Sequence, residues 1–181
     1  MSSNRLAPRM LGFFVTRDHN LMRRVNRWRP PRWFQRWMLL ASRAGDGWLW
    51  YTLGIFVLAV GGPERYAAVC ASGGAILAGI VLFTAIKRIS KRRRPCAFER
   101  HCWSTLLPPD QFSFPSGHSI TAFACVVPMS LIYPDAGPAL YFAACSVAAS
   151  RILLGMHFLS DVVIGSALGA TLGYSAFRLI V

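Results

Sequence analysis

Acidic residues are scarce in this sequence. Its 181 residues include 7 Asp and Glu against 20 Lys and Arg, which gives a formal net charge of +13. Charged side chains make up only 15% of the chain, compared with about a quarter in soluble domains. Hydrophobic residues make up 54% and are grouped in long runs. This composition argues against a water-soluble core and favours membrane spans.

The sequence also lacks the dispersed positive charge of a nucleic-acid-binding surface. Ten Lys and Arg precede Asp46, seven lie between Lys87 and Arg100, and only three are found elsewhere. Basic blocks outside apolar runs are typical of the segments that flank membrane spans. We therefore expect membrane lipids with anionic headgroups as partners, and no nucleic acid.

Metal-site and secretion signals are missing too. No cluster of His, Cys, Asp or Glu has the spacing of a metal site, so we expect neither a metal nor another cofactor. No signal peptide is recognisable at the arginine-rich N-terminus. Of the five cysteines, Cys96 and Cys102 share a polar loop, where a disulfide is an alternative to the free thiols that we favour. The chain length fits a single domain.

The apolar runs predict an all-α fold, namely an integral-membrane helical bundle of about five transmembrane helices. A helix needs roughly 20 apolar residues to cross the hydrocarbon core, and the first candidate is short. The candidate spans are residues 47–62, 66–86, 117–133, 136–154 and 159–181. In the last span, Gly165, Gly169 and Gly173 recur every four residues, which predicts a flat face for close helix packing.

The residues before the first span predict a different environment. Between residues 21 and 40, four Trp and Phe side chains are interleaved with six arginines, a mixture that suits a segment lying in the headgroup layer. Pro30 and Pro31 should break any helix there into two. We therefore divide the chain into a basic, aromatic interfacial segment, residues 1–46, and a transmembrane domain, residues 47–181.

Three clusters of polar residues lie at the ends of the predicted spans, and the first follows the second span. Lys87 and Arg94 are seven residues apart, so a continuing helix would place both on one face. Pro95 marks the end of such a helix. Two cations on one face suit a phosphate dianion, because Arg can bind it bidentately and Lys acts as a point charge. Taken alone, the cluster also fits ordinary juxtamembrane positive charge.

The second cluster, Pro115-Ser116-Gly117-His118, precedes the third span. Ser116 is a good helix N-cap, and Gly117 lets the backbone come close to a ligand. Free N–H groups at a helix start form an anion site. We expect His118 at the edge of that site.

The third cluster lies between the fourth and fifth spans. His157 and Asp161 are four residues apart and would share a helix face. An aspartate hydrogen bond to one ring nitrogen would leave the other free to attack, although a purely structural pair is the alternative. Arg151 adds a third cation. If the spans alternate in direction, all three clusters reach the same side of the membrane.

Every position of one family signature is present in order. The three clusters resemble the signature of the type 2 phosphatidic acid phosphatases, whose superfamily includes the vanadium haloperoxidases: Lys87-x6-Arg94-Pro95, Pro115-Ser116-Gly117-His118 and Ser150-Arg151-x5-His157-x3-Asp161. The resemblance covers residues 87–161. It implies a membrane-embedded lipid phosphatase that needs no metal and forms a phosphohistidine intermediate.

The resemblance also implies a role for each residue. His157 would attack phosphorus, oriented by Asp161, while His118 would protonate the leaving oxygen and later activate water. The phosphoryl oxygens would be held by five residues: Lys87, Arg94, Ser116, Gly117 and Arg151.

The resemblance bears on membrane orientation as well. Membrane members of the family commonly have six spans, and we expect this chain to lack the first of them. With five spans, the N-terminus and the site share a face that carries eighteen of the twenty Lys and Arg. The positive-inside bias then puts the site on the cytoplasmic side of a bacterial inner membrane, an orientation that a sixth span would reverse.

Substrate and class alternatives stay open. Phosphatidic acid, phosphatidylglycerophosphate and polyprenyl diphosphates all fit the pattern, and an outward-facing site would favour an undecaprenyl-diphosphate phosphatase of carrier-lipid recycling. A vanadium haloperoxidase would use the same residues, but those relatives resemble soluble enzymes. A non-catalytic transporter or scaffold with a relict site is the third class, although a relict site should have lost part of the set.

Overall fold

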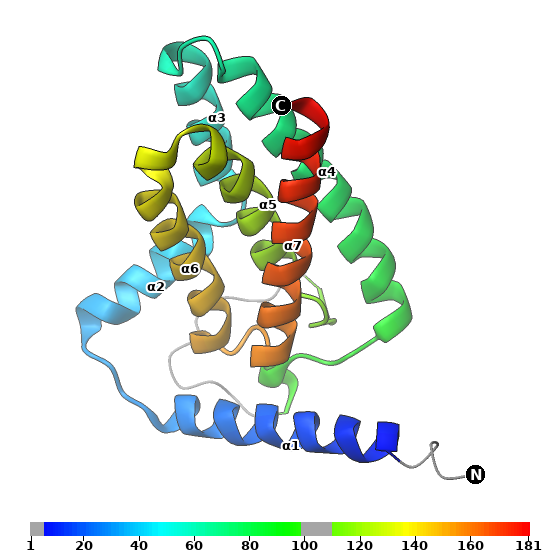
Figure 1. Cartoon of the computed structure of the whole chain (residues 1–181). Helices are drawn as coiled ribbons and strands as arrows, with labels where there is room; N and C mark the ends of the chain where they lie inside the picture. The colour runs from blue at the N-terminus through cyan, green and yellow to red at the C-terminus, as the bar shows by residue number, and fades with distance from the viewer. Residues whose placement is uncertain (1–5, 99–109) are drawn as a thin grey trace.

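The computed structural model describes residues 6–98 and 110–181, with side chains from residue 16 onward. Cys102, and with it the question of its pairing with Cys96, lies outside these residues. The described part is helical with no named β-strand, which confirms the predicted all-α fold. Its helices (Figure 1) are α1 (Leu6–Arg27), α2 (Arg32–Ala44), α3 (Trp48–Val60), α4 (Arg65–Ser90), α5 (Gly117–Ile132), α6 (Gly137–Leu153) and α7 (Leu159–Ile180), with short 3-10 turns η2 (Pro95–Ala97) and η3 (Pro134–Ala136).

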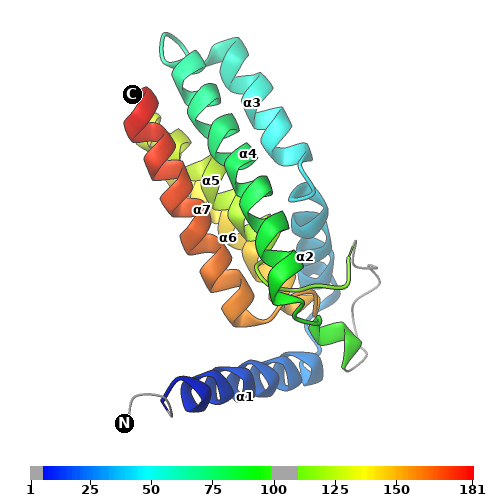
Figure 2. The same ribbon diagram turned by 90° about the vertical axis from the view of Figure 1, so that its right-hand side faces the viewer.

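Helices α3 to α7 alternate in direction and form one bundle (Figures 1 and 2). α5 lies at the centre of this bundle, packed against α4, α6 and α7. Its buried neighbours are small or medium-sized, such as Ala68 of α4 and Ala144 of α6, which allows the helices to approach closely. At one end, the Tyr133 hydroxyl donates to the Gly61 carbonyl at 2.8 Å, so the α3–α4 and α5–α6 turns are joined.

The glycines of α7 pack against the backbone of α5. A Cβ atom at Gly165 would lie 2.8 Å from the Ser116 carbonyl oxygen, and one at Gly169 would overlap the Ile120 carbonyl. α7 therefore contacts α5 at successive turns through positions that accept no side chain. The flat packing face predicted from the four-residue spacing is present.

The lengths of the bundle helices bear on the predicted membrane spans. Three segments are long and apolar enough to cross a membrane: Arg65–Ser90, Pro134–Leu153 and Leu159–Ile180. α3 and α5 are apolar but have only 13 and 16 residues, so the total of five spans stays a prediction. Large apolar side chains such as Phe56 and Val81 are exposed on the helices, as expected for surfaces that contact lipid.

The N-terminal residues form two helices separated by residues 28–31, where the two prolines predicted a break. α1 runs across the end of the bundle (Figures 1 and 2). It is held there by Asp18, which accepts a hydrogen bond from Arg92 at 2.8 Å. α2 packs alongside α6, and the Trp37 ring stacks on Phe142 with 5.4 Å between centroids. α1 thus lies where an interfacial helix would, whereas α2 is part of the bundle.

Candidate active site

The first predicted cluster straddles the end of α4. The helix stops at Ser90, and Lys91 adopts a left-handed conformation with φ 47°. Lys87 therefore sits in the last turn of α4, whereas Arg94 lies in the extended stretch before η2. The continuing helix considered in the sequence analysis does not form, because the chain turns at Lys91. The turn nevertheless brings both cations to one anion.

That anion is the carboxylate of Asp110. Lys87 Nζ donates to Asp110 Oδ2 at 2.7 Å, and Arg94 Nη2 donates to Oδ1 at 2.9 Å. Arg94 Nε also donates to the Asp110 backbone carbonyl at 2.8 Å. Burial by itself would raise the pKa of Asp110, but the hydrogen bonds from Lys87 and Arg94 outweigh it and lower that pKa to about 2. The two cations that the sequence assigned to phosphate thus bind an internal carboxylate in this structure.

His157 is buried with both ring nitrogens engaged. Nδ1 lies 2.6 Å from the Ser113 carbonyl oxygen, and Nε2 lies 3.1 Å from Arg94 Nη1. A carbonyl can only accept and a guanidinium can only donate, so the proton is on Nδ1 and the lone pair is on Nε2. Burial lowers the pKa of His157 to about 3, and the positive charges of Arg94 and Arg151 act in the same direction. His157 is therefore a neutral imidazole with its lone pair on Nε2.

Asp161 lies beside His157 but does not make the hydrogen bond expected from the sequence. The distance from His157 Nδ1 to Asp161 Oδ2 is 3.8 Å, which is too long for a hydrogen bond. Its oxygens instead accept from the Phe158 backbone N–H at 2.9 Å and from Arg92 at 2.6 Å. Asp161 thus caps the start of α7 and adds negative charge next to the histidine, while the Ser113 carbonyl fixes the tautomer.

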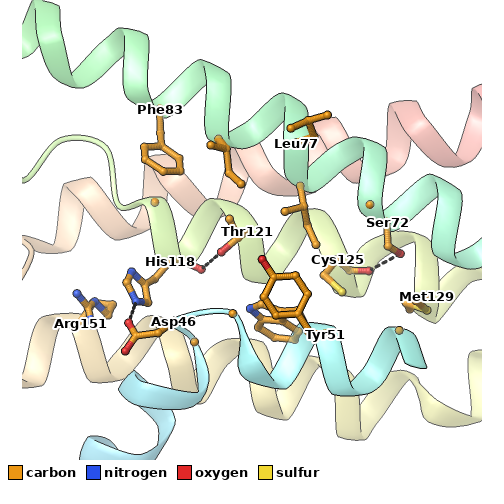
Figure 3. Close-up of a pocket in the computed structure, with 18 of the residues that line it drawn as sticks. Asp46, Tyr51, Ser72, Leu77, Phe83, His118, Thr121, Cys125, Met129 and Arg151 are labelled. Atoms are coloured by element: carbon orange, nitrogen blue, oxygen red, sulfur yellow. Dashed lines mark hydrogen bonds and ion pairs between the residues drawn. The ribbon is translucent and has the colours of Figure 1, made fainter. Parts of the chain in front are cut away.

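The second cluster begins α5 as predicted. Ser116 is the N-cap, and its Oγ accepts from the Ser119 backbone N–H at 3.4 Å. A side chain at Gly117 would meet the Phe83 ring at 3.2 Å. The His118 ring is held by Asp46, whose Oδ1 lies 2.6 Å from Nε2 (Figure 3).

Arg151 is buried with part of its donor capacity unused. Only 3% of its surface is exposed, and Nη1 donates to the Ser42 hydroxyl. Its buried Nε has no hydrogen-bond partner among the residues that the structure describes. A buried donor without a partner is costly, so this guanidinium is suited to receive an anion.

One cavity of about 660 Å³ joins these groups. Six of the eight predicted site residues line it: Lys87, Arg94, Gly117, His118, Arg151 and His157. Ser116 and Asp161 are fully buried outside its lining. From this polar end the cavity extends between α3, α4 and α5 along apolar side chains, among them Tyr51, Leu77 and Met129 (Figure 3).

The sequence profile of the PAP2 superfamily matches residues 68–181, a stretch that contains every predicted site residue. The chain belongs to the PAP2 superfamily. Among its relatives in this superfamily is the decaprenylphosphoryl-5-phosphoribose phosphatase of Mycobacterium tuberculosis, 31% identical over 75% of this chain and 77% of that protein. The lipid A 1-phosphatase of Rhizobium johnstonii is 29% identical over 73% of this chain and 62% of its own length.

Solved PAP2 structures share the fold. The crystal structure of Aquifex aeolicus LpxE superposes with a TM-score of 0.73 at 26% identity, covering 88% of this chain and 93% of that one. A transmembrane PAP2 phosphatidylglycerolphosphate phosphatase from Bacillus subtilis superposes with a TM-score of 0.68, covering 91% and 84%. Its identity of 23% supports the fold alone. With membrane relatives and lipid-facing helices, the protein is an integral membrane protein.

Several residues of the site were missed by sequence reasoning. Asp46 and Asp110 are single acidic residues that belong to no motif. Arg92 is one of several consecutive basic residues after α4, and the sequence does not distinguish it from its neighbours. Ser113 contributes only its backbone carbonyl, for which no side-chain pattern exists. The scarcity of acidic residues was the usable signal, because an isolated carboxylate near a basic cluster is a candidate partner for it.

Proposed function

We propose that this PAP2 protein is a metal-independent phosphatase that hydrolyses a phosphate ester or diphosphate on a membrane lipid, with His157 as nucleophile. The observation that carries this proposal is the neutral His157, with its lone pair on Nε2, at the polar end of a mostly apolar cavity. The relatives named above act on phosphorylated lipids according to their names. An intact set of cations and histidines also argues against a relict site.

The reaction follows from the positions of the polar groups. The substrate phosphate displaces Arg94 from His157 Nε2, which forms a bond to phosphorus as the bond to the lipid oxygen breaks. His118 gives its proton to that oxygen, and the lipid alcohol leaves. A water molecule then attacks phosphorus, returns a proton to His118, and orthophosphate leaves as the phosphorus–nitrogen bond breaks. Lys87, Arg94 and Arg151 hold the phosphoryl oxygens while their charge redistributes.

Gly117 lines the cavity, whereas Ser116 and Asp161 act from behind it. Gly117 offers its backbone N–H at the start of α5, where the helix dipole favours an anion. Ser116 keeps that helix start in place as its N-cap. Asp161 adds negative charge beside His157 and opposes the effect of the nearby cations on its pKa. We therefore propose that Asp161 contributes to catalysis through its negative charge next to His157.

The apolar part of the cavity suits one long hydrocarbon chain. Its walls come from α3 and α4 and include Ile55, Leu58, Ile76 and Ile80. A phosphate bound near Arg151 would place the attached chain along this wall. We therefore favour a lipid that carries its phosphate at the end of a single chain, such as a polyprenyl derivative, over phosphatidic acid and phosphatidylglycerophosphate.

We also propose that the site faces the cytoplasm. α1, which carries the exposed Arg24 and Arg27, lies across the end of the bundle where Asp18 contacts Arg92 and Ser160 (Figures 1 and 2), and anionic headgroups would bind these arginines there. A fluorescent protein fused to the N-terminus should fluoresce in cells, and alkaline phosphatase fused to the C-terminus should be active. The opposite pattern would place the site outside.

Phosphate release by the purified, detergent-solubilised protein in EDTA tests the proposal. The substrates are a polyprenyl phosphate, a polyprenyl diphosphate, phosphatidic acid and phosphatidylglycerophosphate. Wild type should release phosphate from at least one of them, and His157→Asn should release none while eluting as the same folded species. Full activity in His157→Asn, or activity only with added metal, would contradict the mechanism.

A further inference from the structure

The turn between α2 and α3 brings an unexpected carboxylate to the cavity. Asp46 lies in this turn, and its Oδ1 is 2.6 Å from His118 Nε2 (Figure 3). The two residues are 72 positions apart in the sequence. The family match begins at residue 68, so Asp46 comes from a part of the chain that precedes it.

The backbone on both sides of Asp46 is specialised for this approach. A Cβ atom at Gly45 would lie 2.6 Å from Val147 Cγ1 of α6 and 3.1 Å from His118 Cδ2. Only glycine therefore lets the turn pack so close to the imidazole. Gly47 has φ 125°, a conformation that side chains disfavour. The turn thus depends on glycine immediately before and after the carboxylate.

A second contact ties the same region to the site. Ser42, in the last turn of α2, is buried and accepts a hydrogen bond from Arg151. The end of α2 and the following turn therefore reach both a phosphate-binding cation and the proposed acid. Asp46 itself is about half exposed, and exposed ion pairs add little stability. Its contact with His118 matters for chemistry more than for folding.

We propose that Asp46 is the positioning residue of His118: its carboxylate accepts Nε2–H, which leaves Nδ1 as the nitrogen that exchanges a proton with the leaving oxygen. The proposal rests on the phosphatase function described above. In the first step the Nδ1 proton moves to the lipid oxygen as the phosphorus–oxygen bond breaks. In the second step Nδ1 accepts a proton from the attacking water. Asp46 neither gains nor loses a proton in the cycle.

The charges around His118 explain why a carboxylate is needed there. Arg151 of α6 and Lys87 of α4 both act on the imidazole as positive charges, and Asp46 is the negative charge that opposes them. A positive neighbour disfavours the protonated ring and a negative one favours it. Without Asp46, fewer molecules would carry the proton that the leaving lipid requires.

Two substrates that differ in leaving group separate this role from a structural one. A lipid alkyl phosphate needs its leaving oxygen protonated, whereas p-nitrophenyl phosphate releases a stable phenolate without help. In single-turnover measurements, Asp46→Asn should slow phosphoryl transfer from the lipid to His157 by about 10- to 100-fold and barely affect transfer from p-nitrophenyl phosphate. The first turnover is compared because the later hydrolysis step is common to both substrates. The alkaline limb of the pH profile should move to lower pH. Asp46→Glu should recover part of the lost rate.

The matched control is Asp135→Asn, which removes an exposed carboxylate at the opposite end of the bundle and should leave both rates unchanged. Equal losses on both substrates with an unaltered pH profile would overturn the positioning role. Wild-type activity on the lipid tests the proposed function separately, because an inactive wild type contradicts the function whatever Asp46 does.

A readout without turnover keeps the inference testable in that case. Diethyl pyrocarbonate modifies neutral imidazole, and peptide mass spectrometry can follow its reaction at His118. In Asp46→Asn the modification should begin at lower pH than in wild type. Identical pH dependence in the two proteins would overturn the proposal.

Discussion

Asp110 holds the two cations that we propose bind the substrate phosphate. Its carboxylate accepts hydrogen bonds from Lys87 at 2.7 Å and from Arg94 at 2.9 Å. With its pKa lowered to about 2, it stays ionised at any working pH. On this proposal, an incoming phosphate competes with an internal anion, which keeps the cations in place but weakens their net affinity for phosphate.

Removing that charge should strengthen phosphate binding. Asp110→Asn should lower the inhibition constant of orthophosphate by roughly tenfold, the equivalent of one charge-assisted hydrogen bond of about 1.5 kcal/mol. Product-inhibition kinetics on wild type and variant measure the change, with Asp135→Asn as the control for lost charge. An unchanged or weaker inhibition constant would show that Asp110 does not compete with phosphate.

The buried His157 should make stability depend on pH. Its pKa falls from 6.5 to about 3 on folding, so between these values the unfolded chain binds a proton that the folded chain does not. Stability therefore rises with pH in this window, and the histidine destabilises the fold as pH drops below 6.5. The unfolding temperature of His157→Gln in detergent should fall less between pH 7 and pH 5 than that of wild type. An equal fall in the unfolding temperatures of the two proteins would contradict a buried neutral imidazole.

Among the elements, the α5–α7 contact places the second and third clusters next to each other. The Ser116 backbone N–H donates to the Asp161 carbonyl at 3.1 Å, so both helices begin at one point. The glycine face of α7 allows this approach. Gly169→Ala should destabilise the fold by about 1–3 kcal/mol, because the new Cβ meets a backbone carbonyl that cannot move aside.

Gly74→Ala is the matched control for that packing claim. A Cβ at Gly74 in α4 would meet nothing within 4 Å, so this variant should unfold at the wild-type temperature or above it. Thermal unfolding in one detergent compares the two substitutions. Similar midpoints for both variants would show that the α5–α7 approach contributes nothing special.

A second matched pair of glycines in α4 tests the proposed contact between the cavity wall and the hydrocarbon chain of the lipid. Gly73 lines the cavity and Gly74 does not, while a side chain at either position would enter open space. Gly73→Leu should therefore raise KM several-fold for a long-chain lipid phosphate and spare p-nitrophenyl phosphate. Gly74→Leu should leave both substrates unaffected. Equal effects of the two substitutions would refute the proposed path of the chain.

The helix boundaries could be predicted well where composition changes sharply. Glycine and proline turns bounded α4 to α7 to within a few residues, because an apolar run ends where backbone must turn in a polar environment. The role of α2 could not be predicted. Its arginines and aromatics suit the membrane interface, but its packing on α6 depends on a partner surface that only the folded chain creates.

At the scale of the whole molecule, alternating helices bring distant polar residues to one end. This convergence could be predicted from the order of spans and clusters, and it places His157, His118 and Arg151 around one cavity. The hydrogen bonds within it could not be predicted. Asp46 and Ser113 reach the histidines from positions 72 and 44 residues away, and one of them acts through its backbone.

The most direct test of the account is whether the phosphoryl group passes through His157. Wild type mixed with its lipid phosphate and quenched by rapid denaturation should yield a His157 peptide heavier by one phosphoryl group, labile to acid and stable to base. With p-nitrophenyl phosphate, His118→Ala should accumulate this adduct, because its formation needs no proton donor, whereas its hydrolysis needs His118 as the base that accepts a proton from the attacking water. Phosphate release without any adduct in either protein, or an adduct on another residue, would contradict the mechanism.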